Sequence, residues 1–398
     1  MAGAGVTAAL LALPAGTAGA FEAHSFLGEL QGMTTLSTTV PPNGDVNPYG
    51  VAVVPTSIGR LQQGDVLVSN FNDAANEQGT GHTIVELPPG GLPAGTPAPV
   101  FADIHLSSAE GCPGGVGLTT ALSVLPSGWV VVGSLPTTDG TSATARAGCL
   151  IVLNAEGQVV TTIAGNPING PWDMVATQFG DHAVLFVTNV LNGITPAANA
   201  ANSVVDGGTV VRVDLGLSGP VPQVESETVI ASGFGERTDP DALVIGPTGV
   251  GLSQDGRFLY VADSLGNRIT LVPAPFFLQG PFFGTGFTVS SGGALNDPLG
   301  LAVAPNGDVI TVNGNDGNAV ETRFGEQVAT VPLDTTAMPG AAPGAGTLFG
   351  IAIAPDDSGL YFVDDGSNTL NLLGANHHEG MGHGFGQGRF AAAGDDQG

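Results

Sequence analysis

The chain has 398 residues, of which 42% are hydrophobic and 11% charged, with 63 Gly and 29 Pro. This composition favours many short strands joined by tight turns over long amphipathic helices. The net charge is −27 and all 8 basic residues are Arg, which excludes nucleic acid as a partner and disfavours anionic membrane surfaces.

The first 20 residues predict an export signal, because an apolar run at 6–13 is followed by Ala18-Gly19-Ala20 just before Phe21. No other stretch is long and apolar enough to insert into a membrane. We therefore expect a mature protein that is secreted or periplasmic. In such a compartment the two cysteines, Cys112 and Cys149, are expected to form a disulfide.

A repeat organises the rest of the chain. Each unit opens with an apolar strand, at 50–55, 121–126, 174–179, 249–254, 300–305 and 350–355. A turn and a second apolar strand follow at 65–70, 128–133, 182–189, 257–263, 308–313 and 359–364. Third strands are predicted at 83–87, 149–153, 209–213, 269–272, 319–323 and 369–373, and outer strands at 100–104, 159–164, 227–231, 286–290 and 327–332.

Four strands per unit, repeated about every 50 residues, predict an all-β fold, a six-bladed β-propeller of antiparallel blades. The sixth unit lacks a fourth strand of its own. Residues 33–40 alternate in the manner of a strand and precede the first unit, so we expect them to complete the sixth blade and close the ring. The prediction is one domain at 21–373, followed by a Gly- and His-rich disordered tail at 374–398.

Two segments carry a family resemblance. Residues 261–271 read VADSLGNRITL and residues 363–370 read VDDGSNTL, and both resemble the NHL repeat signature. The resemblance extends over nearly the whole mature chain as a repeat pattern, with the close matches in units four to six. It implies a propeller whose function is open, since NHL repeats occur in binding scaffolds and in secreted enzymes.

Two rings of residues are expected around one mouth of the central channel. The residues just before each first strand are Tyr49, Thr120, Asp173, Thr248, Leu299 and Phe349, and Trp172 lies beside them. The residues that end each second strand are Asn70, Gly133, Asn189, Asp263, Asn313 and Asp364. For Phe349 we expect a place in the core, whereas Tyr49 and Trp172 fit either the core or contact with a ligand.

Known propeller enzymes provide a test of these rings. Propeller lactonases of similar architecture hold calcium with several carboxylate and amide oxygens, but the first ring offers one carboxylate, Asp173. Propeller lyases use histidines at this mouth, and no ring position is His. The Asn and Asp residues of the second ring are interpreted first as turn-forming groups, with calcium binding as the alternative and no other cofactor expected.

The sequence therefore favours a monomeric, non-catalytic binding scaffold. An unknown protein or small molecule would bind at the channel mouth and at the loops 72–81, 136–147 and 193–207. The alternative is a metal-dependent hydrolase or lyase with Asp173 as the central ligand and Asn70, Asn189, Asp263, Asn313 and Asp364 nearby.

Overall fold

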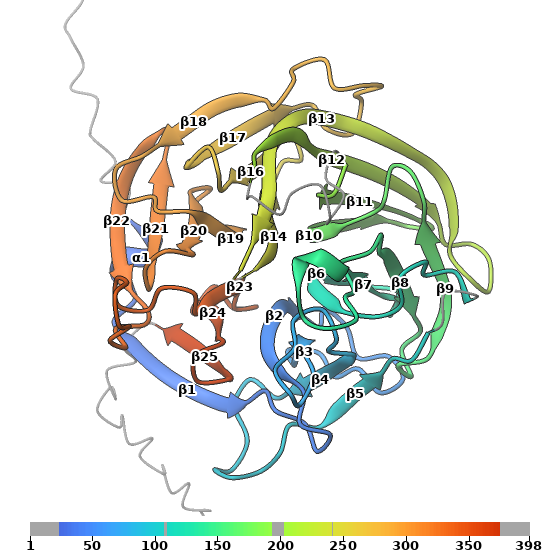
Figure 1. Ribbon diagram of the computed structural model, residues 1–398, viewed down its shortest axis with the longest axis horizontal. Helices are drawn as coiled ribbons and strands as arrows, with labels where there is room; N and C mark the ends of the chain where they lie inside the picture. Colours follow the sequence, from blue (N-terminus) through green and yellow to red (C-terminus); the bar gives the residue numbers. More distant parts are fainter. Residues whose placement is uncertain (1–23, 107–109, 193–202, 241, 375–398) are drawn as a thin grey trace, which may run out of the picture.

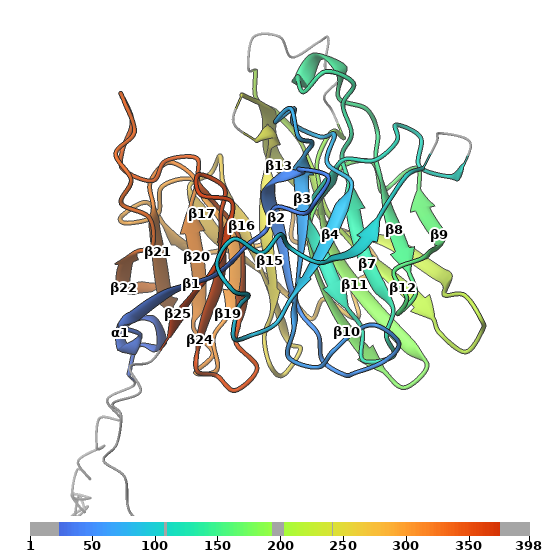
Figure 2. The same cartoon turned by 90° about the horizontal axis from the view of Figure 1, so that it is seen from below.

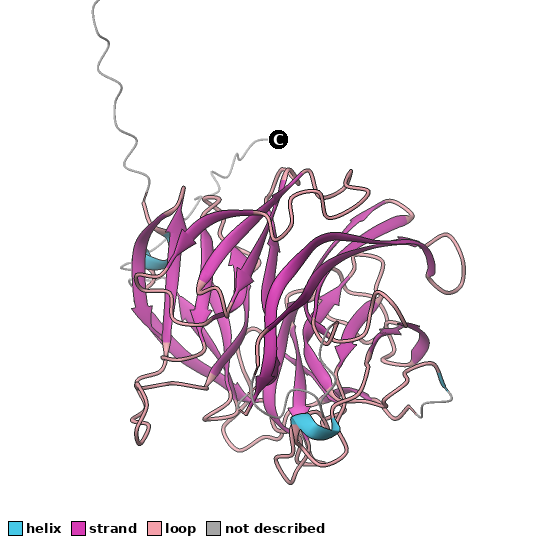
Figure 3. Ribbon diagram, turned by 45° about the horizontal axis from the view of Figure 1, so that its top comes forward, coloured by secondary structure: helices cyan, strands magenta, loops and turns pink. Residues whose placement is uncertain are grey.

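The computed structural model describes residues 24–106, 110–192, 203–240 and 242–374. The predicted export signal, nearly all of the predicted tail and most of the 193–207 loop lie outside the described residues. Strands dominate, and the helical segments are short, among them α1 (Phe26–Glu29) and η2 (Ser142–Thr144) (Figure 3). No helix in the described ranges is long and apolar enough to cross a membrane.

Six antiparallel blades surround a central axis (Figure 1), which confirms the predicted fold. The first blade consists of β2 (Val46–Val53), β3 (Val66–Asn72), β4 (Thr83–Leu87) and β5 (Val100–Asp103). The second blade consists of β6 (Leu118–Val124), β7 (Val130–Ser134), β8 (Cys149–Leu153) and β9 (Val159–Ala164). The third blade is β10 (Pro171–Phe179), β11 (His182–Asn189), β12 (Val205–Gly216) and β13 (Gln223–Asp239), and it carries an additional strand, β14 (Leu243–Ile245).

The last three blades have four strands each. The fourth is β15 (Pro247–Leu252), β16 (Phe258–Asp263), β17 (Arg268–Pro273), β18 (Phe287–Ser291), and the fifth is β19 (Pro298–Val303), β20 (Val309–Asn313), β21 (Asn318–Arg323), β22 (Glu326–Pro332). The sixth blade is β23 (Leu348–Ile353), β24 (Gly359–Asp364), β25 (Thr369–Gly374) and β1 (Gly32–Thr38). Strand β1 pairs antiparallel with β25, for example Met33 with Leu373, so the predicted closure of the ring by the N-terminal segment is confirmed.

The first strand of each blade faces the axis, and neighbouring first strands approach closely. A Cβ atom added to Gly300 would lie 2.0 Å from the carbonyl oxygen of Phe349, and one added to Gly350 would lie 2.1 Å from that of Tyr49. Only glycine fits where two backbones approach this closely. All six first strands are also irregular in their pairing with the second strand at this level, which turns side chains toward the axis.

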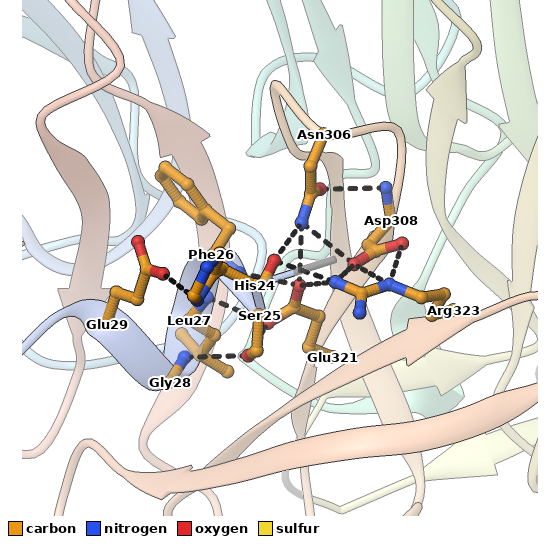
Figure 4. Close-up of polar contacts among 10 residues, drawn as sticks. All are labelled: His24, Ser25, Phe26, Leu27, Gly28, Glu29, Asn306, Asp308, Glu321 and Arg323. Carbon is orange, nitrogen blue, oxygen red and sulfur yellow. Dashed lines mark hydrogen bonds and ion pairs between the residues drawn. The ribbon is translucent and has the colours of Figure 1, made fainter. Parts of the chain in front are cut away.

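The N-terminal segment is fixed to the outside of the fifth blade (Figure 4). The buried Glu321 carboxylate accepts hydrogen bonds from the backbone N–H groups of Phe26 and Leu27, at 2.9 and 2.7 Å. Arg323 donates to the carbonyl oxygen of His24 and pairs with Asp308 at 2.6 Å. Burial of Leu27 against the same blade adds apolar packing, so β1 enters the ring from an anchored position.

The predicted disulfide between Cys112 and Cys149 is present, with Cα atoms 5.3 Å apart. It joins the loop that follows β5 to the first residue of β8. The bond therefore ties the loop between the first and second blades to the third strand of the second blade. Figure 2 shows strands β4, β7, β8 and β9 of these two blades side by side in the edge-on view of the ring.

Candidate functional site

The aromatic residues predicted at the mouth form a plug across the channel. Tyr49 stacks on Phe349 at 3.9 Å and on Phe71 at 4.5 Å between ring centroids, and it lies 6.5 Å from Trp172. Each of these four side chains is at most 3% exposed. The Trp172 indole N–H donates to the carbonyl oxygen of Val244 at 3.1 Å. Phe349 is buried in the core, as expected. Tyr49 and Trp172, for which the sequence allowed either the core or contact with a ligand, are also buried in the core.

The register of the third blade places Asp173 deeper than its position in the predicted ring. Pro171 pairs with Asn189 as Pro48 pairs with Asn70, and Asp173 pairs with Thr188 as Gly50 pairs with Ser69. Trp172 is thus level with Tyr49, and Asp173 is level with Gly50. The carboxyl group lies on the far side of the aromatic plug, in the channel itself.

Asp173 lines a channel cavity of about 330 Å³ whose other described walls are mainly Val, Ala, Leu, Ile and Gly. Its two carboxylate oxygens accept hydrogen bonds from the backbone N–H groups of Met174 and Val250, at 2.8 and 3.2 Å. Burial raises the pKa of Asp173 to about 7, although both backbone N–H groups act in the opposite direction. One carboxylate with both oxygens engaged does not supply the six to eight oxygens that calcium requires, so the surroundings of Asp173 do not fit a calcium centre.

The members of the second predicted ring other than Gly133 carry polar side chains that are buried or half-buried and hydrogen-bonded to nearby loops and strands. The Asn189 amide oxygen accepts from the backbone N–H groups of Asn169 and Gly170. Asp263 accepts from Gly266 and pairs with Arg268 at 2.7 Å. The remaining members have similar contacts: Asn70 donates to Thr39 and Thr83, Asn313 contacts Ala294, Asn296 and Asp316, and Asp364 accepts from Ser367. Asp263 and Asp364 thus bond within the turn that follows their strand. Asn70, Asn189 and Asn313 also reach segments 17–31 residues away, and the side-chain oxygen of Asn70 is buried without a partner among the described residues.

A second cavity, of about 630 Å³, opens at the mouth above the plug. Leu299 and Phe349 contribute apolar surface to it. Its polar lining is rich in acidic and amide groups, namely Asp239, Asp297, Asp365, Asn47, Asn72, Asn76, Gln78 and Asn315. The mouth cavity is therefore a polar, acidic chamber. Leu299 and Phe349 of the first predicted ring and residues Asn72, Asn76 and Gln78 of the predicted 72–81 loop line it, whereas Tyr49, Trp172, Asp173 and the second predicted ring do not.

Two of the mouth carboxyl groups are unusually hard to ionise. Burial raises the pKa of Asp297 to about 7, and the charge of Asp239 adds to this rise while Arg237 opposes it. Burial also raises the pKa of Asp365 to about 7, with the charge of Asp364 acting in the same direction. No hydrogen bond from a described residue reaches either carboxyl group, whereas Asp239 pairs with Arg237 at 2.7 Å.

Amide oxygens beside these carboxyl groups are also without partners. The side-chain oxygens of Asn47, Asn72 and Gln78 are buried, and no described residue donates a hydrogen bond to them. A buried acceptor without a donor costs about 1–3 kcal/mol. Such groups are explained when a ligand or water supplies the missing donor.

The sequence does contain a signal for part of this site. Asn47 and Asp297 each precede a proline in related contexts, Asn47-Pro-Tyr-Gly and Asp297-Pro-Leu-Gly. Both have positive φ, at 60° and 62°, a conformation for which Asn and Asp are enriched. A polar residue before proline at the same place in two blades is therefore a sequence pattern from which these two residues of the mouth cavity could have been predicted.

The carboxylates of the mouth cavity are not gathered closely enough to form a calcium site. Calcium binds oxygen ligands at about 2.3–2.6 Å, which brings them close together around the ion. Among the described residues, the three mouth carboxylates do not form a group whose ligand atoms all lie within 4.8 Å of one another; the one group of three His, Cys, Asp or Glu that does so lies elsewhere, at His82, Asp103 and His105. The mouth as it stands is not a formed calcium centre.

An apolar cavity of about 710 Å³ lies at the opposite end of the ring, between the third and fourth blades. Its aromatic lining comes from Phe179, Phe258, Phe276 and Phe277. Phe277 is 80% exposed and the nearby Phe282 is 73% exposed. Clustered exposed aromatic rings are typical of a surface that contacts an apolar partner.

The fold and the mouth cavity define a six-bladed β-propeller with an acidic chamber at one end of its channel. No protein-family model and no curated protein sequence matches the chain, so the predicted NHL assignment stays a resemblance. Solved structures do match. A gluconolactonase from Xanthomonas campestris is 14% identical with a TM-score of 0.50, covering 88% of this chain and 92% of that one.

The calcium-binding protein regucalcin from Agrobacterium tumefaciens is also similar. It is 14% identical with a TM-score of 0.50, and the match covers 86% of this chain and 95% of that protein. At this identity the similarity establishes the shared propeller fold, and function has to be argued from the site.

Proposed function

We propose that the protein is an exported binding propeller that takes up a small, positively charged polar ligand in the mouth cavity. The observation that carries this proposal is the combination of three carboxyl groups with buried, unpartnered amide oxygens in one chamber. Acceptors without donors call for a ligand rich in N–H or O–H groups, and an ammonium or guanidinium group supplies both donors and charge. The disulfide supports an oxidising compartment.

Burial supplies the selectivity for charge. Asp297 and Asp365 are largely desolvated and accept no hydrogen bond from the described residues. A neutral ligand would leave them protonated near neutral pH, whereas a cation stabilises the ionised form and gains a charge-assisted hydrogen bond. An anionic ligand would be repelled by these carboxylates and by the net charge of −27.

The test is calorimetric titration of the full chain with arginine methyl ester, spermidine and choline at pH 8. We expect at least one of these cations to bind, and the variants Asp297→Asn and Asp365→Asn to weaken its affinity about tenfold each, the scale of a lost hydrogen bond to a charged group. Asp255→Asn is the matched control, because it removes the same charge from an exposed turn outside the mouth cavity. Equal weakening by the control, or no binding of any cation, would contradict the proposal.

Hydrolysis of a lactone or ester is the second candidate. It is favoured by the similarity to a gluconolactonase structure and by two cavity carboxyl groups with pKa about 7, a value suited to a general base at neutral pH. In this reaction Asp297 or Asp365 would take a proton from the attacking water, and the ring oxygen of the lactone would leave and be protonated.

Hydrolysis of δ-gluconolactone, followed with a pH indicator, separates the two candidates. A rate above the uncatalysed reaction that falls by about a hundredfold or more in Asp297→Asn or Asp365→Asn would establish catalysis. Metal analysis of the same samples asks whether calcium is present at one ion per chain. Cation binding without turnover would leave the protein a binding propeller.

A further inference from the structure

Two histidines and an aspartate meet at the edge of the first blade. His82 Nδ1 lies 2.7 Å and His105 Nε2 lies 3.0 Å from the same oxygen, Asp103 Oδ1. The centroids of the two imidazole rings are 4.5 Å apart. One ligand atom from each of the three residues falls within 4.8 Å of the others.

The backbone holds these side chains in place. His82 directly precedes β4, and Asp103 ends β5. Thr83 pairs with Asp103 in the sheet, and the backbone N–H of Ile104 donates to the carbonyl oxygen of His82 at 2.9 Å. The three residues therefore lie at the start of β4 and at the end of β5, two neighbouring strands in fixed register.

A buried carboxylate, that of Asp45, binds the backbone next to His82. Asp45 is 2% exposed, and its Oδ2 accepts from the backbone N–H groups of His82 and Thr83 and from the Thr83 hydroxyl, at 2.9–3.1 Å. The same oxygen lies 3.7 Å from His82 Nδ1. Asp45 thus holds the strand start from which the His82 ring projects.

We propose that His82, Asp103 and His105 form a binding site for a divalent transition-metal ion. Two imidazole nitrogens and one carboxylate oxygen are a ligand set that suits zinc and its neighbours. Metal–ligand bonds of about 2.0–2.2 Å place tetrahedral ligand atoms roughly 3.3 Å apart. The present separations of 2.7 and 3.0 Å reach this spacing by a small movement of Asp103, whose side chain is half exposed.

A fourth ligand position faces accessible space. His82, His105 and Glu110 line one cavity of about 410 Å³, and Asp103, His105 and Glu110 line another of about 560 Å³. Neither cavity shares a residue with the mouth cavity. Among the described residues the site thus has three protein ligands and a fourth position that faces a cavity, an arrangement typical of zinc sites that keep a water molecule. Because its cavities share no residue with the mouth cavity, the site is independent of the function proposed for the mouth.

The test uses the full, untagged chain in which His377, His378 and His383 of the tail are replaced by Ala, so that the tail cannot contribute ligands. Zinc is titrated by calorimetry and Co²⁺ by visible absorption, whose intensity distinguishes four-coordinate from six-coordinate ions. We expect one ion per chain. His82→Ala, His105→Ala and Asp103→Asn should each lower the affinity at least about tenfold.

The matched control is His182→Ala, since His182 faces a single carboxylate, Glu225, at 3.3 Å with similar exposure. It should leave zinc affinity unchanged. His105 is 71% exposed, so its variant should fold normally, and zinc should raise the unfolding temperature of the parent chain but not of this variant. Zinc binding that survives all three ligand variants, that disappears when only the tail histidines are replaced, or that never reaches one ion per chain would overturn the proposal.

Discussion

The central channel has two halves that differ in how they treat a buried carboxyl group. Below the aromatic plug, Asp173 is alone among mostly apolar walls, and both its oxygens accept backbone N–H groups. Above the plug, Asp297 and Asp365 share a larger cavity and accept no hydrogen bond from the described residues. All three have a pKa of about 7.

An equal pKa therefore does not imply an equal role. The backbone bonds of Asp173 join it to the neighbouring fourth blade through Val250, so this group completes the ring of strands. Asp297 and Asp365 accept no hydrogen bond from the described residues and line the mouth cavity, which leaves their hydrogen-bonding capacity for a ligand. The hydrogen-bond partners of a carboxyl group and the cavity beside it, more than its pKa, distinguish a structural group from one that binds a ligand.

The largest expected effect comes from breaking the plug between the halves. Trp172→Ala should lower the free energy of unfolding by about 3–5 kcal/mol, because it empties a core position and leaves the carbonyl oxygen of Val244 without its donor. Urea unfolding measures this loss. Trp129→Ala is the control, since Trp129 is partly buried and should cost less; an equal or smaller loss for Trp172 would mean that the plug does not stabilise the ring.

Much of the fold could be predicted because it follows from local patterns that repeat. Apolar strands and turn residues recur in every blade. Only the sixth unit lacked a fourth strand in the sequence pattern, so the alternating segment before the first blade was expected to supply it, and β1 does so. The pairing of Cys112 with Cys149 followed from there being only two cysteines.

The site was harder to predict because it depends on depth and on contacts between blades. The sequence pattern put Asp173 level with Tyr49, but the strand pairing places Trp172 at that level and Asp173 level with Gly50, one residue deeper in the channel. Asp297 and Asp365 belong to different blades and are far apart in the chain, so no spacing links them. The two histidines are separated by a strand, a loop and another strand, and they meet only through the register of β4 and β5.

A smaller effect is expected from the lower half of the channel. The folded-state pKa of Asp173 is raised from 3.8 to about 7, so the native state binds the proton more tightly than the unfolded chain does. Its contribution to stability is complete below about pH 4 and is lost as the pH rises through about 7. Asp173→Asn carries no charge, and it should be less stable than the parent at pH 5 because an amide has only one acceptor oxygen.

The difference between parent and Asp173→Asn should shrink or reverse by pH 8, by about 2–3 kcal/mol overall, at about 1.4 kcal/mol for each pH unit below the folded-state pKa. Urea unfolding at pH 5, 6.5 and 8 measures it. Asp255→Asn, at an exposed turn where the pKa is lowered to about 2 by hydrogen bonds from Arg257 and Ser253, should show a constant difference over this range. A constant difference for Asp173→Asn as well would mean that its carboxyl group is ionised throughout.

The smallest effect on stability, and the sharpest on binding, is expected at the mouth. The charge of Asp239 raises the pKa of Asp297, and the Arg237 guanidinium that pairs with Asp239 lowers it. Asp239→Asn removes the first influence and frees Arg237 to strengthen the second, so the pKa of Asp297 should fall. Since a cation prefers the ionised carboxylate, the affinity of the parent for a bound cation should rise between pH 6 and 8.

In Asp239→Asn that rise should begin at lower pH, while the free energy of unfolding changes by less than about 1 kcal/mol, as expected for a partly exposed ion pair. Calorimetric titration across this pH range measures the midpoint. Asp297→Asn should lose the part of the rise that belongs to Asp297 and keep the part due to Asp365. A midpoint that does not move in Asp239→Asn would show that the charge of Asp239 does not influence how Asp297 binds the cation. The mouth carboxyl groups would then differ from the isolated Asp173 only in their hydrogen-bond partners and in the cavity that they line.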